Sequence, residues 1–121
     1  MSEARISPSL LSADPINIVA GAKSMKEAGA DMLHLDVMDG SFVPNLTFGP
    51  QCASRLHQEG ILPLDIHLMV KCLDWAVPAF LPYAEYLTVH VEATDHLHRV
   101  LQTIRSAGKK AGVALNPATS P

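Results

Sequence analysis

The chain has 121 residues, a net charge of −3 at pH 7, 48% hydrophobic residues and only 5% aromatic residues. Its length suits one domain, expected over residues 1–121, and its aliphatic composition is typical of α/β proteins. A slightly acidic chain without a basic block argues against nucleic acid and anionic membrane surfaces as partners. No apolar run approaches the ~20 residues that a membrane-spanning helix needs.

Strand-like and helical segments alternate along the whole chain. Apolar strand-like runs are predicted at 5–10, 32–37, 63–69, 86–92 and 111–116, and helices at 15–28, 50–58, 75–81 and 95–107. Asp14 suits the cap and Pro15 the first turn of the first helix, and Gly60 suits the position after the second. Pro78 is expected to interrupt the third helix. This alternation predicts βαβ units and a parallel sheet.

The predicted strands carry apolar residues on one face and mixed or polar residues on the other. Both faces of a doubly wound sheet are covered by helices and are mainly apolar, whereas a barrel has one face lined by functional side chains. We therefore predict an incomplete (β/α)8 TIM barrel with about the first five βα units. A closed barrel takes ~250 residues, so the chain is expected to be part of a longer protein. The alternative is a self-sufficient half-barrel, and in either case open sheet edges predict a homo-oligomer.

Two predicted strands alternate ligand-type side chains with aliphatic ones. His34 and Asp36 point to one face of the first, and His67 to the corresponding face of the second, because successive strand residues alternate between faces. Two imidazoles and a carboxylate from adjacent strands would form an open site for a divalent metal, which suits Lewis-acid chemistry on an oxygen-rich substrate. By themselves, His34 and Asp36 could instead form a buried ion pair.

Three further features lie near this motif. Asp65 is expected deeper on the same polar face as His67, in a polar network. His90 and Glu92 share a face of a later predicted strand, where they could imitate a metal-binding pair. The turn-forming loop at 39–45 follows the first ligand strand and is expected to act as a lid or pocket wall.

Five segments in order resemble the ribulose-phosphate 3-epimerase family. They are Ser7-Pro8-Ser9-Leu10-Leu11-Ser12-Ala13-Asp14, the stretch from His34 to Pro50, Asp65-Ile66-His67-Leu68-Met69-Val70, Thr88-Val89-His90-Val91-Glu92-Ala93, and the stretch from Gly112 to Thr119. The resemblance covers essentially the whole chain, but only the N-terminal part of the family's barrel. Lys71-Cys72 departs from the family, which often has Glu-Asn there, at a position expected on the rim.

The resemblance implies interconversion of D-ribulose 5-phosphate and D-xylulose 5-phosphate by inversion at carbon 3. In that family, a proton is abstracted and returned through a metal-stabilised enediolate, with two carboxylates on opposite faces of the substrate. The residues implied are His34, Asp36 and His67 as metal ligands, Asp36 as catalytic acid/base, Ser9 and His67 as substrate contacts, and Met38 and Met69 as pocket walls. The segment containing His90 does not ligate the metal in the family, so His90 and Glu92 are expected behind the ligands or at the rim. The family's second aspartate and glycine-rich phosphate loops have no counterpart in these motifs.

Several expectations remain open at this point. The cofactor is expected to be one divalent cation. Histidine and carboxylate ligands are compatible with zinc, iron, manganese or cobalt, so the metal is not specified. Alternatives to the pentose epimerase are a 3-epimerase for allulose 6-phosphate and a non-catalytic metal-binding half-barrel. The first residues lack a signal-peptide pattern, and Cys52 and Cys72 are isolated, so a cytoplasmic location is expected.

Overall fold

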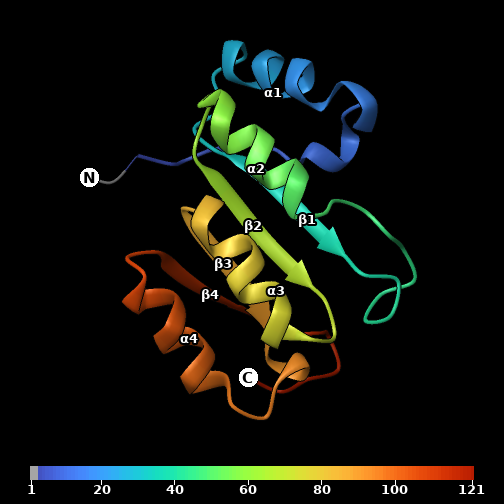
Figure 1. Cartoon of the computed structure of the whole chain (residues 1–121), viewed down its shortest axis with the longest axis vertical. Coiled ribbons are helices and arrows are strands. Elements are labelled where there is room, and N and C mark those ends of the chain that lie inside the picture. Colours follow the sequence, from blue (N-terminus) through green and yellow to red (C-terminus); the bar gives the residue numbers. More distant parts are fainter. Residues whose placement is uncertain (1–2) are drawn as a thin grey trace.

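The computed structural model describes residues 3–121 and shows a parallel four-stranded sheet that alternates with helices (Figure 1). The strands are β1 (Leu33–Met38), β2 (Leu64–Met69), β3 (Tyr86–His90) and β4 (Lys110–Ala114), in the spatial order β1-β2-β3-β4. The main helices are α1 (Ile18–Glu27), α2 (Pro50–Glu59), α3 (Leu73–Phe80) and α4 (Leu97–Ser106). This α/β fold is consistent with part of a TIM barrel.

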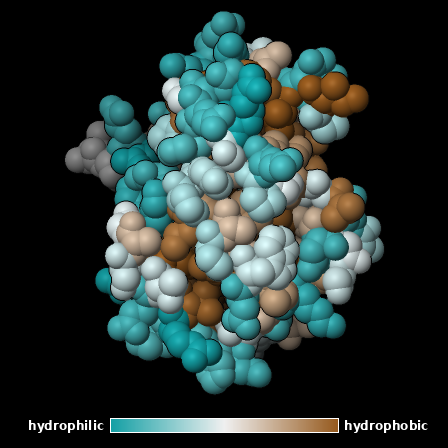
Figure 2. All heavy atoms as spheres, viewed as in Figure 1, coloured by the Kyte–Doolittle hydropathy of each residue, from teal (hydrophilic) through white to brown (hydrophobic). Residues whose placement is uncertain are grey.

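The core lies between the helices and one face of the sheet. In β1 and β2, alternate residues are buried, so that Leu35 and Ile66 face the helices. Helix residues such as Ala53, Val77 and Ile104 belong to the same apolar cluster. Figure 2 shows the side seen in Figure 1 as a largely hydrophilic surface, with apolar residues visible between polar ones. The opposite face of the sheet therefore carries the half-buried polar residues, as the alternation predicts.

The prediction of a strand at residues 5–10 is wrong, because this segment is not one of the strands of the sheet. Residues 5–10 run beside β1, but among residues 3–121 they form only the isolated bridge Ser9↔His34. The carbonyl of Pro8 accepts from the backbone N–H of His34 at 2.9 Å, whereas Pro8 itself has no N–H to donate to a ladder. The Ser9 side chain then caps a short 3-10 helix, η1 (Leu10–Ser12), which ends the extended segment.

The other predicted elements differ mainly at their ends. The first helix begins with a 3-10 turn, η2 (Pro15–Asn17), whose start is capped by Asp14 as predicted. Helix α2 ends at Glu59 and is followed by the capping residue Gly60, whose φ of 60° lies in the left-handed region that favours glycine. Helix α3 begins two residues earlier than predicted and continues past Pro78, followed by η3 (Leu81–Tyr83), because its buried residues pack into the core.

The third strand of the sheet is shorter than predicted. β3 ends at His90, and the chain turns into η4 (Val91–Ala93), so Glu92 does not share a strand face with His90 as expected. β4 lies at 110–114 instead of 111–116.

Two expectations involve residues 1 and 2, which lie outside the described residues. They are the single domain over residues 1–121 and the lack of a signal-peptide pattern in the first residues. Within residues 3–121, no helix combines the length and hydropathy that crossing a bilayer requires.

Candidate metal centre

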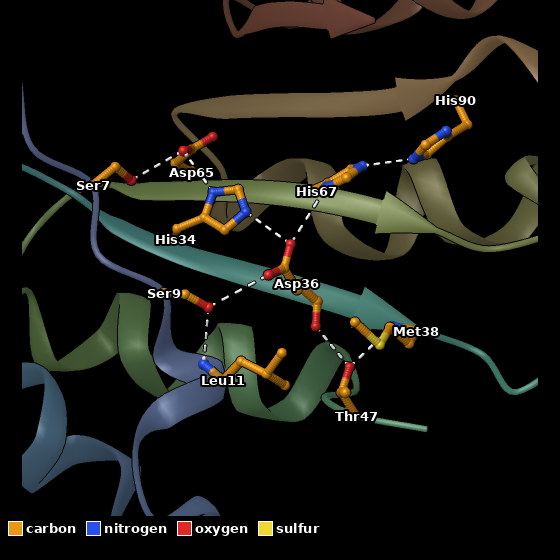
Figure 3. A network of polar contacts seen from close by, with 10 residues as sticks. All are labelled: Ser7, Ser9, Leu11, His34, Asp36, Met38, Thr47, Asp65, His67 and His90. Atoms are coloured by element: carbon orange, nitrogen blue, oxygen red, sulfur yellow. Dashed lines mark hydrogen bonds and ion pairs between the residues drawn. The ribbon is translucent and has the colours of Figure 1, made fainter. Parts of the chain in front are cut away.

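Three predicted ligands meet on the polar face of the sheet. His34, Asp36 and His67 each place one ligand atom within 4.8 Å of the other two (Figure 3). Asp36 and His67 are directly opposite in the register of β1 and β2, which explains their approach. The Oδ1 atom of Asp36 is 2.8 Å from His34 Nε2 and 3.2 Å from His67 Nδ1. Register and alternation together therefore build the cluster that the sequence predicts.

A second carboxylate holds the outer side of His34. His34 Nδ1 is 2.8 Å from Asp65 Oδ2, and the Ser7 hydroxyl donates to the same carboxylate at 3.0 Å. The hydrogen bond that His34 donates to Asp65 outweighs burial and, together with Asp36, raises the pKa of His34 to about 9. Burial disfavours the charged form of Asp65, but the hydrogen bonds from His34 and Ser7 lower the pKa of its carboxyl. This confirms the expected polar network around Asp65.

Asp36 is oriented by Ser9. The Ser9 hydroxyl is 3.4 Å from Asp36 Oδ2, while Oδ1 faces the two imidazoles. The Ser9 oxygen also accepts from the backbone N–H of Leu11 at 3.1 Å, which ties it to the start of η1. Ser9 therefore has a local capping role and also contacts the ligand cluster.

His67 also has a partner on its outer side, and this partner is His90. Their Nε2 atoms are 2.8 Å apart, and His90 Nδ1 is 3.2 Å from Glu92 Oε1. Burial and the neighbouring His90 lower the pKa of His67. Each of the two candidate ligand histidines therefore has one nitrogen directed to the cluster and the other engaged by a polar residue.

The donor set fits a divalent cation. A tetrahedral ion with ligand bonds of about 2.0–2.1 Å holds its ligand atoms about 3.3 Å apart. The 3.2 Å between Asp36 Oδ1 and His67 Nδ1 is close to this value, and the 2.8 Å between Asp36 Oδ1 and His34 Nε2 is shorter, as in a direct hydrogen bond. The side chains of His34, Asp36 and His67 are 25%, 16% and 21% exposed, so the cluster is half-buried but reachable from outside. Two imidazoles and one carboxylate, with outer partners, are the arrangement expected of a metal site with an open position.

The two remaining predicted site residues, Met38 and Met69, lie further along the same two strands. Met38 and Met69 are paired in the register of β1 and β2, one alternation beyond Asp36 and His67 on the same half-buried face. In the loop after β1, the ring of Phe42 lies 5.0 Å from that of His90. The loop therefore contacts a residue behind the cluster, in line with the expected pocket wall.

Sequence reasoning missed the contact between His67 and His90. The alternation of β3 indicates that Thr88 and His90 share the polar face, so the direction of His90 was readable. His67 is directly opposite Thr88 in the register, and His90 lies one alternation further along. The contact is therefore diagonal, and only the register together with the side-chain directions shows it.

A ligand cluster on the polar face of a parallel sheet, with helices on the opposite face, defines a barrel-type α/β protein with a candidate metal centre. The model of the "Ribulose-phosphate 3 epimerase family" matches residues 5–121. The chain belongs to this family.

Individual relatives agree with the family model. Proteins named ribulose-phosphate 3-epimerase are 47% identical over 116 residues in Bacillus subtilis and 49% over 116 residues in Rhodospirillum rubrum. The protein of that name in Escherichia coli (strain K12) is 46% identical over 121 residues. These matches cover 95% to 98% of this chain but 52% to 54% of the relatives. The chain therefore spans about half the length of the curated relatives it matches.

Proposed function

We propose that this chain supplies the metal-binding half of the active site of a ribulose-phosphate 3-epimerase. The enzyme would interconvert D-ribulose 5-phosphate and D-xylulose 5-phosphate. The observation that carries this proposal is the convergence of ligand atoms from His34, Asp36 and His67 within 4.8 Å on one sheet face. The names of the relatives support the substrate and the reaction type.

The reaction needs a base next to carbon 3, because its proton is only weakly acidic. In our proposal, the carboxylate of Asp36 removes that proton, and Ser9 keeps the carboxylate oriented through its contact with Oδ2 at 3.4 Å. A zinc, iron, manganese or cobalt ion held by His34, Asp36 and His67 would stabilise the negative charge that develops on the substrate oxygens. Return of the proton to the opposite face needs a second acid. In the family this acid is a second aspartate, which has no counterpart in the motifs of this chain.

The methionines complete the proposed site on the substrate side. Met38 and Met69 are adjacent across β1 and β2 at the carboxyl ends of the strands, where barrel enzymes hold their substrates. Their thioethers are polarizable and weakly hydrated, so they would limit water around the reacting carbon. Ser9 and His67 would contact the substrate from the neighbouring positions.

The decisive experiment follows the carbon-3 proton of D-ribulose 5-phosphate in D2O by NMR, with the metal added and with a chelator. Metal-dependent exchange is expected, and exchange without formation of xylulose 5-phosphate would show that only one substrate face is served. Asp36→Asn is expected to abolish this exchange, whereas Asp95→Asn, at an exposed position, is the matched control. Parallel titrations with Zn²⁺, Co²⁺ and Mn²⁺ by calorimetry identify the preferred metal.

The outcomes separate the remaining alternatives. Metal binding without any proton exchange would favour a non-catalytic metal-binding unit over a catalytic one. Exchange that is faster with allulose 6-phosphate than with ribulose 5-phosphate would favour the six-carbon substrate. A chain that neither binds metal nor exchanges the proton would contradict the proposed site.

We also propose a cytoplasmic, homo-oligomeric protein. Among the described strands, β4 is paired only with β3, and Val113 and Leu115 beside its open edge are each 42% exposed. For the 121-residue chain by itself, an unpaired parallel edge with apolar residues would favour association. Analytical ultracentrifugation that shows a monomer at all protein concentrations would contradict the oligomer.

A further inference from the structure

Thr47, in the loop between β1 and α2, contacts the backbone of β1 beside the candidate metal centre. Its hydroxyl donates to the carbonyl of Asp36 at 2.6 Å, and the same oxygen accepts from the backbone N–H of Met38 at 2.9 Å (Figure 3). The backbone N–H of Thr47 also donates to the Met38 carbonyl at 3.2 Å. The direction of each bond is fixed, because a backbone N–H can only donate and a carbonyl can only accept.

These contacts complete an edge of β1 that the neighbouring segment leaves open. Within the described part of the chain, segment 5–10 forms a single isolated bridge to β1, at His34, whose N–H donates to that segment at 2.9 Å. Residues two apart on a strand direct their backbone groups to the same side, so Asp36 and Met38 face the same edge beyond this bridge. Thr47 therefore takes the place of the partner that β1 loses where the chain turns into η1.

The contacts span the residue between the proposed base and the proposed pocket wall. Val37 lies between Asp36 and Met38, and it is 3% exposed in the core. With the backbone fixed on both sides of Val37, alternation directs the two flanking side chains to the polar face. Asp36 Oδ1 lies 2.8 Å from His34 and 3.2 Å from His67, so a shift of this backbone would move a ligand away from both imidazoles.

Resting on the function proposed above, we propose that Thr47 is a positioning residue for the candidate metal centre, which sets the backbone of Asp36 and Met38 from the loop after β1. The bridge Asp39↔Leu46 lies directly beside these contacts, so the loop returns to β1 at this point. Thr47 is itself half-buried, which limits replacement of its hydroxyl by water. Ligand geometry in metal sites depends on supporting hydrogen bonds of this kind.

The first test measures the contact in the metal-free chain by amide hydrogen exchange, followed by NMR. Thr47→Val keeps the β-branched shape and removes the hydroxyl, so the Met38 N–H loses its acceptor. We expect about tenfold faster exchange at Met38, the size of one net hydrogen bond, and unchanged exchange at Ile66 in the middle of the sheet. Equal acceleration at both amides would reduce Thr47 to a general contribution to stability and overturn the proposal, as would unchanged exchange at Met38.

The second test asks whether the same hydroxyl supports metal binding. Thr47→Val is expected to bind Zn²⁺ about tenfold more weakly in calorimetry, at the lower end of the range for supporting residues. Thr47→Ser keeps the hydroxyl and should restore the wild-type affinity. Thr103→Val is the matched control, because the Thr103 hydroxyl also donates to a backbone carbonyl, that of Arg99 at 3.0 Å, at an exposed position on α4. Serine and valine variants of equal affinity would overturn the proposal.

Failure of this inference is distinguishable from failure of the proposed function. A wild-type chain that binds no Zn²⁺ would contradict the metal centre, whatever the exchange at Met38 shows. A wild-type chain that binds Zn²⁺ while Thr47→Val retains the full affinity would contradict the positioning role alone. If Thr47→Val does not fold, the wild-type chain decides, because a Met38 amide that exchanges as fast as an unstructured peptide would overturn the contact.

Discussion

Asp39 connects the loops that follow β1 and β2, and its removal offers a strict test of how these loops are held. Its Oδ1 atom accepts from the backbone N–H groups of Ser41 at 2.8 Å and Phe42 at 2.7 Å. Its Oδ2 atom accepts from the backbone N–H of Lys71 at 2.8 Å. One carboxylate therefore shapes the turn after β1 and joins it to the first residues beyond β2.

Asp39→Asn keeps the size of the side chain but replaces one acceptor with a donor. The amide oxygen can retain the two bonds to the turn, whereas its NH₂ group then faces the N–H of Lys71. A hydrogen bond to a charged group contributes about 1.5–3 kcal/mol, and partial exposure lets water replace part of it, so we expect a loss of about 2 kcal/mol in the free energy of unfolding. Asp39→Ala, which removes all three acceptor contacts, should cost more.

The pH dependence gives an independent check on the same interaction. Partial burial opposes ionisation of Asp39, but the N–H donors of Lys71, Ser41 and Phe42 together lower the pKa of its carboxyl below 3.8. A lowered pKa in the folded state stabilises the protein above the unfolded value, and this stabilisation is lost as pH falls through the folded value. The difference between wild type and Asp39→Asn should therefore be full at pH 7 and shrink below about pH 3.8.

Urea unfolding followed by far-UV circular dichroism measures this difference, at pH 7 and at decreasing pH. Asp95→Asn serves as the control because it makes the same chemical change at an exposed position. The reasoning is refuted if Asp39→Asn lies within about 0.5 kcal/mol of wild type at pH 7, which is the range of neutral surface substitutions. A difference that stays constant into acid would also refute it.

Three further substitutions test packing and the ligand cluster. Leu35→Ala removes a fully buried side chain from the helix-facing side of β1 and should cost about 2–5 kcal/mol in urea unfolding; a cost below 1 kcal/mol would mean the core is not packed as described. Gly21→Ala places a new Cβ 2.9 Å from the Cβ of Ala13, so overpacking of about 1–3 kcal/mol should exceed the gain of up to about 1 kcal/mol in helix propensity. Adding Ala13→Gly should recover part of the loss, and purely additive effects would argue against the contact. Asp65→Ala leaves Nδ1 of His34 without its carboxylate and should weaken Zn²⁺ binding about 10–100-fold in calorimetry, whereas an unchanged affinity would remove Asp65 from the metal centre.

The amino-acid sequence by itself determined the faces of the strands and the alternation of strands with helices. His34 and Asp36 share a face because strand side chains alternate with a period of two, and this rule acts within a few residues. Helix ends were readable for the same reason: Asp14 caps the 3-10 turn that leads into α1, and Gly60 ends α2 through its own backbone freedom. These features depend on local geometry, so the sequence order was enough to predict them.

Other features were decided only by the tertiary structure. Segment 5–10 has a strand-like pattern, yet Pro8 offers no N–H and the chain turns into η1, so only one bridge to His34 forms. The approach of His90 to His67 depends on the register between β2 and β3, and the bond from Lys71 to Asp39 joins two loops that are 32 residues apart. Register and loop contacts are set by how the helices pack the sheet as a whole. No local pattern records them, which is why the convergence of His34, Asp36 and His67 on one face was predictable and the contact of His90 with His67 was not.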